Sequence, residues 1–118
     1  MMKTTLVIAC AAFVGCGSAP VPADKLAKTA ASVKSAEELG ADKDPNAALH
    51  LRLAREEVES AKNLIKDSDN ERAGFVLDRA SADADAAREI ARAKASKVEV
   101  DKYKEQVAEQ KTKFGGGN

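Results

Sequence analysis

Small and aliphatic residues recur in this chain at alternating steps of four and three, and this spacing most limits what the chain can fold into. One run comprises Ala47, Leu51, Ala54, Val58, Ala61 and Ile65. A second comprises Ala73, Leu77, Ala80, Ala84, Ala87 and Ala91, and the same steps continue through Lys94 and Val98. Heptad spacing puts each run on one stripe of a helix, and Ala lets neighbouring helices approach closely. The pattern therefore predicts an all-α fold with coiled-coil-like, Ala-rich seams.

Capping residues divide the predicted helical domain, residues 23–114, into helices over about 23–39, 45–66 and 69–113. Gly40 suits the left-handed residue that ends a helix, and Asp44 before Pro45 suits the start of the next one. Ser68 and Glu71 fit a capping box for the third helix. The first helix has its own apolar stripe of Leu26, Ala30, Val33, Ala36 and Leu39 or Gly40. We expect an antiparallel three-helix bundle, or hairpin, with a long C-terminal helix.

The apolar stripe of the third helix changes register near residues 94–97. Beyond that point the four-three steps meet Asp101 and Glu105, and a register offset by one residue takes over. Its members are Ala93, Ser96, Val100, Tyr103, Val107, Gln110 and Phe114. The second helix is also too short to cover all of the third.

Two arrangements of residues 96–114 remain open from the sequence. In the first, an exposed helix presents Val100, Tyr103, Val107 and Phe114 to a protein partner or to a second copy of the chain. In the second, the chain folds back as a short fourth helix and buries the stripe on the bundle. A Gly-rich stretch, residues 115–118, is expected to be a flexible tail.

The N-terminus has the features of a bacterial lipoprotein signal peptide over residues 1–15. A cationic start ending in Lys3 precedes an apolar run that is too short to cross a membrane as a helix. The run ends at Gly15 and Cys16, in a sequence that resembles a lipobox. The resemblance implies cleavage between Gly15 and Cys16 and a lipid on Cys16. Pro20 and Pro22 disfavour helix at the residues before them, so residues 16–22 are expected to comprise the lipidated Cys and an extended tether. Cys10 is a competing site, and a secretory signal without lipid is the alternative.

Charge and composition exclude several classes of function. The chain carries 19 basic and 19 acidic residues, so it has no broad basic field for nucleic acid. His50 is the sole histidine and has no evident catalytic partner, and the acids of residues 67–71 fit helix capping better than a calcium loop. Asp83 and Asp85 point to different sides of a helix, so they do not form one paired site and are expected to be solvated. We therefore expect no catalytic residues, metal or cofactor, and the chain is not expected to be an enzyme.

Three segments of the helical region resemble a known family. They are residues 49–62 (LHLRLAREEVESAK), 67–73 (DSDNERA) and 79–87 (RASADADAA). Together with the lipobox they resemble the small bacterial lipoproteins grouped as domain of unknown function 4398, over roughly residues 1–95. The resemblance implies a helical lipoprotein of Gram-negative envelopes that faces the periplasm, and it transfers no catalytic residues.

The sequence thus leads to one functional expectation. The protein would be anchored by lipid in the bacterial cell envelope and face the periplasm, at the outer rather than the inner membrane because Gly17 follows Cys16. It would act as a structural, protein-interaction or spacer module. The alternative is a non-catalytic small-ligand or peptidoglycan-associated binding protein.

Overall fold

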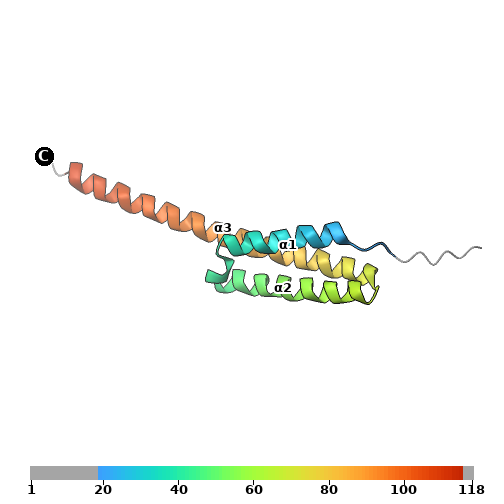
Figure 1. The fold of residues 1–118 in the computed structure, drawn as a ribbon. Coiled ribbons are helices and arrows are strands. Elements are labelled where there is room, and N and C mark those ends of the chain that lie inside the picture. The colour runs from blue at the N-terminus through green and yellow to red at the C-terminus, as the bar shows by residue number, and fades with distance from the viewer. Residues whose placement is uncertain (1–18, 116–118) are drawn as a thin grey trace, which may run out of the picture.

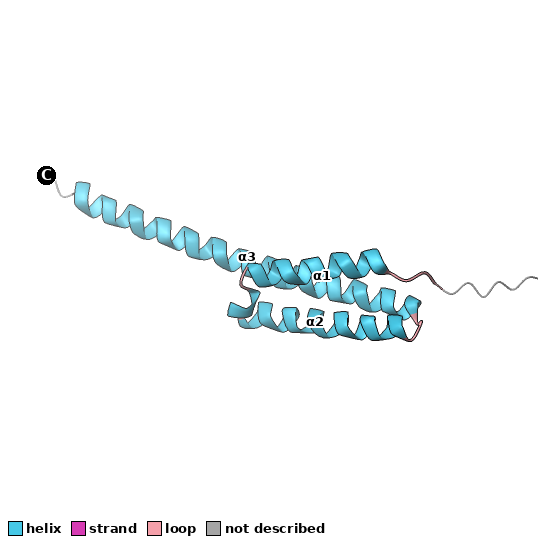
Figure 2. Ribbon diagram, in the orientation of Figure 1, coloured by secondary structure: helices cyan, strands magenta, loops and turns pink. Residues whose placement is uncertain are grey.

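The computed structural model describes residues 19–115, and this part of the chain is built from helices. The elements are α1 (Ala23–Glu38), a short 3-10 turn (Ala41–Lys43), α2 (Pro45–Lys66) and α3 (Asn70–Phe114) (Figure 1). Helices account for 89% of this part and no strand occurs within it (Figure 2), which confirms the all-α class. The helix ends differ by at most one residue from the expected spans.

Several predictions lie outside the described residues. They concern the signal peptide at 1–15, the cleavage and lipid site at Gly15 and Cys16, the first part of the tether and the tail beyond Gly115. The rest of the tether, Ala19–Pro22, is non-helical and leads directly into α1.

The seam between α2 and α3 forms most of the core, and it follows the heptad spacing of the sequence. The buried residues of α2 are Ala47, Leu51, Ala54, Val58 and Ala61. Those of α3 are Ala73, Leu77, Ala80, Ala84, Ala87 and Ala91. Cross-helix pairs run in opposite order along the two helices, from Arg79–Glu57 to Lys94–Asp44. Because most seam residues are Ala, close packing is spread over many small contacts.

The first helix packs chiefly against α3, and its buried face contains Val33 and Ala36 as expected but Thr29 in place of Ala30. Thr29 is buried, and its hydroxyl lies 3.5 Å from the Leu77 carbonyl oxygen, whereas Ala30 is exposed. Of the two alternatives at the end of the stripe, Leu39 is exposed and Gly40 is half-buried. Because α1 packs mainly on α3, Thr29 faces the core instead of Ala30.

In the connection between α1 and α2, one helix ends and the next begins as the capping residues predict. Gly40 is left-handed, with φ +76°, directly after α1. The Asp44 carboxylate then accepts hydrogen bonds from the backbone N–H groups of Asn46 and Ala47, at 3.0 and 3.2 Å, with Pro45 in the first turn.

The connection between α2 and α3 differs from the predicted capping box. Ser68 is left-handed, with φ +62°, and its N–H donates to Ile65 while that of Asp69 donates to Leu64. This is a Schellman ending for α2. Since Ser68 is used to stop α2, Asp69 caps α3 by accepting from the Arg72 N–H at 3.4 Å. The expected Ser68–Glu71 box is therefore wrong by one residue.

Candidate interaction surface

The third helix continues well past the other two, and about the second half of it has no packing partner in the described part of the chain. Figure 1 shows α3 extending beyond the ends of α1 and α2. Ala91 is the last buried residue, and every described residue from 92 to 115 is exposed. The helix does not break there, so the fold-back arrangement with a short fourth helix is not adopted. We call residues 93–114 the arm and residues 19–91 the body.

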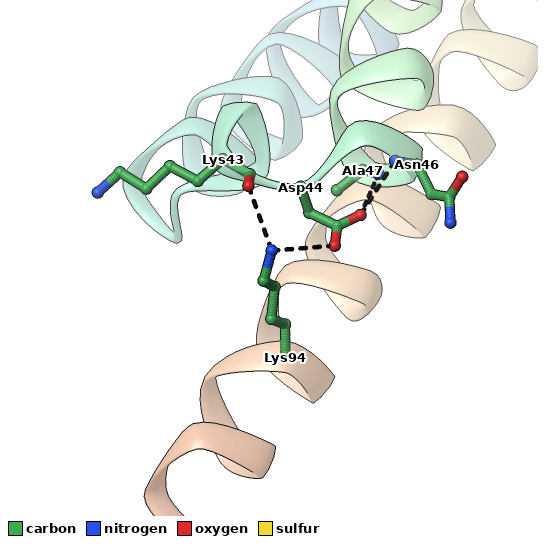
Figure 3. Close-up of polar contacts among 5 residues, drawn as sticks. All are labelled: Lys43, Asp44, Asn46, Ala47 and Lys94. Atoms are coloured by element: carbon green, nitrogen blue, oxygen red, sulfur yellow. Dashed lines mark hydrogen bonds and ion pairs between the residues drawn. The ribbon is translucent and has the colours of Figure 1, made fainter.

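A polar clamp marks the point where the body ends and the arm begins (Figure 3). Lys94 occupies the next seam position after Ala91, and its ammonium donates to the Lys43 carbonyl and to Asp44 Oδ2, both at 3.2 Å. The carboxylate of Asp44 thus bonds to α3 through one oxygen and to the start of α2 through the other. The hydrogen bond from Ala47, together with Lys94, lowers the pKa of Asp44.

The exposed apolar residues of the arm gather on one face, as the second register predicts. Val100, Tyr103 and Val107 line a shallow hollow together with Lys104. The Tyr103 residue is 60% exposed. Phe114 follows two turns after Val107 on the same stripe and is 85% exposed. The structure therefore brings three of the four predicted surface residues into one hollow, with the fourth beyond it. We call this face the arm stripe.

Among the polar contacts that sequence reasoning missed is one between His50 on α2 and Asp83 on α3. Their Nδ1 and Oδ1 atoms lie 2.7 Å apart, with side chains 37% and 23% exposed. Each residue directly precedes a seam residue, Leu51 or Ala84. Pairing the two seams in opposite directions across the turn would have brought these positions near each other. Asp83 is thus not the freely solvated residue that the sequence indicated.

A second partly buried acid, Glu57, lies on the same side of the α2–α3 seam. Its Oε1 atom is 2.6 Å from the Arg79 guanidinium, while its side chain is only 12% exposed. The other oxygen, Oε2, is buried and lacks a hydrogen-bond partner in the described part of the chain. Burial raises the pKa of Glu57, Arg79 opposes this, and the nearby Asp83 carboxylate adds to it. This arrangement has no nucleophile and no third group in catalytic geometry.

The described residues contain neither a cluster of three or more acids, histidines or cysteines suited to a metal ion nor a helix long and apolar enough to cross a membrane.

Residues 19–115 thus form an all-α protein whose helices pack through many small contacts and whose arm is exposed. No pocket lined by catalytic groups occurs in these residues. Residues 24–103 match the family described as "Domain of unknown function (DUF4398)", and the chain belongs to this family. No curated protein and no solved structure matches the chain.

The matched range includes the body from Asp24 onward and reaches Tyr103 in the arm. It extends further into the arm than the resemblance seen in the sequence, which ends near residue 95. Val107 and Phe114 lie beyond the match, as does the N-terminal segment with Cys16.

Proposed function

We propose that this protein is a lipid-anchored spacer and interaction module of the bacterial cell envelope, facing the periplasm from the outer membrane. A lipid on Cys16 holds one end at the membrane. The body is an antiparallel three-helix bundle that orients α3, and the arm presents its stripe to a protein partner.

The observation that carries this proposal is the separation of the two ends of α3. The Asn70 side-chain amide donates to the Ala19 carbonyl at 2.8 Å, so the chain just after the proposed anchor meets the first residue of α3. The helix then runs for 45 residues, about 68 Å, to Phe114. Ala19, three residues after the proposed anchor, and the stripe therefore lie at opposite ends of the helix.

Charge is consistent with anchoring by lipid instead of by basic residues. Acidic and basic residues are equal in number, so attraction to an anionic membrane surface contributes little. One acyl chain gives only marginal membrane binding, whereas two or more hold a protein stably. The proposed attachment at Cys16 therefore requires the multiple acylation that is typical of bacterial lipoproteins.

The anchor is tested by growing cells that express the full chain with radiolabelled palmitate. We expect the protein to incorporate label, Cys16→Ala to lose it, and Cys10→Ala, the matched control, to keep it. Label that persists in Cys16→Ala would contradict the assignment of the lipid to Cys16. A chain without any label would support the secretory alternative.

The interaction surface is tested by photocrosslinking in cells from positions 100, 103 and 107. We expect adducts from these positions and much weaker ones from position 105, which lies on the opposite face of the same helix. Adducts of equal strength from position 105 would show that the arm has no preferred binding face. The mass of the adduct distinguishes another protein from a second copy.

A further inference from the structure

We propose that the occupant of the arm stripe is a second copy of this chain, and that two arms pair as a parallel, in-register, two-stranded coiled coil. This rests on the proposed function only in that the arm is an interaction surface. In heptad terms the a positions are Ala93, Val100, Val107 and Phe114. The d positions are Ser96, Tyr103 and Gln110.

The composition of the arm stripe suits pairing with an identical helix. β-Branched residues at a positions, here Val100 and Val107, favour two parallel strands. In register, each apolar layer meets its own copy, and Gln110 meets a polar amide that can hydrogen-bond to it. A slipped register would set Gln110 against an apolar residue, so this layer selects the in-register pairing.

The charges beside the stripe favour the parallel direction. Parallel pairing sets each g position beside the e position five residues later in the other chain. Glu99 at g therefore meets Lys104 at e, and the pair occurs twice by symmetry. Lys104 is exposed and held only by Asp101, at 3.8 Å in its own helix, so it is free to reach across.

The remaining parallel pairs carry no strong penalty. Lys111 at e meets Gln106 at g, which is uncharged. Lys97 at e meets Arg92 at g, but Arg92 is already paired with Glu89 at 3.3 Å in its own helix.

The antiparallel direction is disfavoured by the same residues. It sets e positions opposite e positions of the second chain, and the e positions of the arm are Lys97, Lys104 and Lys111. Lysines would then face lysines along one whole edge of the seam. Like charges in this geometry repel, so charge complementarity selects parallel arms.

The body does not obstruct a parallel pair. Followed back along α3, the same register passes through Ala82 and Phe75, and both are exposed. At these two positions the face is left open by α1 and α2. Arg79 and Glu89 also fall on it and interrupt its apolar character, so the paired region begins at Ala93. Parallel arms leave both bodies on the same side, which suits two chains held by one membrane.

The expected association is weak in dilute solution. The arm spans three heptads, and three of its seven core positions are Ala, Ser or Gln. Anchoring two chains on one membrane raises their effective concentration and strengthens pairing without any new contact. We therefore expect the protein to form dimers on the membrane. The same protein, extracted in detergent and diluted, should be mainly monomeric.

Disulfide crosslinking of the full chain in its own cells tests the pairing. In register, residues 96 and 110 each lie opposite their own copy, within the Cα separation of about 4–7 Å that a disulfide needs. We expect Ser96→Cys and Gln110→Cys to form disulfide-linked dimers on mild oxidation. Thr112→Cys, on the outer face of the same helix, is the matched control and should stay at the level of the parent chain, which also reports any disulfide through Cys10 or Cys16.

Two outcomes overturn the proposal. Dimers from Ser96→Cys and Gln110→Cys that are no more abundant than those from Thr112→Cys would show that the arm stripe is not a self-pairing face. Linkage between co-expressed Ser96→Cys and Val107→Cys copies, without linkage of Ser96→Cys to itself, would show an antiparallel pair.

Charge reversal tests the direction independently. Glu99→Lys should weaken dimer formation by Gln110→Cys about tenfold, because two attractive pairs become repulsive. Lys104→Glu added to Glu99→Lys should restore it. Failure of the double variant to restore crosslinking would overturn the parallel alignment.

The proposed lipid anchor and the proposed pairing of arms can be refuted independently. Palmitate labelling without crosslinks would retain the anchor and refute self-pairing. Crosslinks through residue 110 without palmitate label would retain self-pairing and refute the anchor.

Discussion

Lys94 and Asp44 join the last turn of packed α3 to the first turn of α2, with Nζ and Oδ2 3.2 Å apart. The same carboxylate caps α2, so one side chain both starts a helix and ties it to its neighbour. Beyond this pair, every described residue of α3 is exposed. The clamp therefore defines where the bundle ends and the arm begins.

Removal of the Asp44 carboxylate should destabilise the body in two distinguishable ways. Asp44→Ala loses the cap and the Lys94 pair, and we expect its melting temperature to fall by about 5 °C at pH 7. Asp44→Asn keeps a capping oxygen and should lose less. Thermal unfolding followed by circular dichroism measures both, and a melting temperature of Asp44→Ala equal to that of the parent chain would contradict the role of the clamp.

The pH dependence of the clamp follows from the direction of its pKa shift. Since folding lowers the pKa of Asp44, its contribution is present above the usual Asp pKa, about 3.9, and is lost as pH falls through the lower folded value. We expect the parent chain and Asp44→Asn to differ most at neutral pH and to converge near pH 2. A difference that grows on acidification would refute this.

The contribution of Glu57 to stability should change with pH in the opposite direction. Burial raises its pKa in the folded state, so stability from this residue is greatest below the usual Glu pKa, about 4.3, and is lost as pH rises through the folded value. Glu57→Gln should remove this loss and flatten the profile of melting temperature between pH 4 and 7. The exposed neighbour variant Glu56→Gln is the control, and an unchanged profile in Glu57→Gln would show that the buried oxygen carries no penalty.

The parts of the fold that depend on local sequence were predictable. The seam of α3 from Ala73 to Ala91 and the cap at Asp44 follow from spacing and from hydrogen-bonding groups within a few residues. The exposure of the arm was left open because the same stripe could have packed on the body. The continuous helix through residues 92–114 decides between the two arrangements.

Features that depend on how two helices rotate and slide were not predictable from periodicity alone. Thr29 replaces Ala30 in the core because α1 turns toward α3. His50 meets Asp83 because of the offset between α2 and α3. Asp69 caps α3 because Ser68 is already committed to ending α2. In the first two cases, the contact that decides the arrangement joins residues of different helices. In the third, one residue, Ser68, could serve either of two capping motifs.

The Ala-rich seam should tolerate no larger side chain. Ala80 is fully buried at the α2–α3 seam, and we expect Ala80→Leu to lower the free energy of unfolding by about 1–3 kcal/mol through overpacking. Ala82 lies two residues away on the exposed face, so Ala82→Leu is a matched control with little expected effect. Chemical denaturation measures both variants, and equal stability of the two would show that the seam has room for a larger residue.

Gly40 and Ser68, the left-handed residues after α1 and α2, lead to opposite predictions for the effect of substitution on stability. Gly40 adopts φ +76° and Ser68 adopts φ +62°, conformations that cost a residue with a Cβ atom about 1 kcal/mol. Gly40→Ala should therefore destabilise the protein by about that amount, and Ser68→Gly should stabilise it by a similar or smaller one. Denaturant midpoints compare the two variants with the parent chain. A gain in stability from Gly40→Ala would contradict the left-handed ending of α1.

The arm should contribute to binding but not to the stability of the body. Tyr103 is exposed and more than three turns beyond Ala91, the last buried residue, so Tyr103→Asp or Val107→Asp should leave the melting temperature within about 2 °C of the parent value. Both variants should weaken crosslinking of the arm, because an acid at a core position of the pair is desolvated without a partner. Leu77→Asp, at a fully buried position, should unfold the body and so serves as the contrast. Global unfolding of Tyr103→Asp by circular dichroism would mean that the stripe belongs to the core of the monomer.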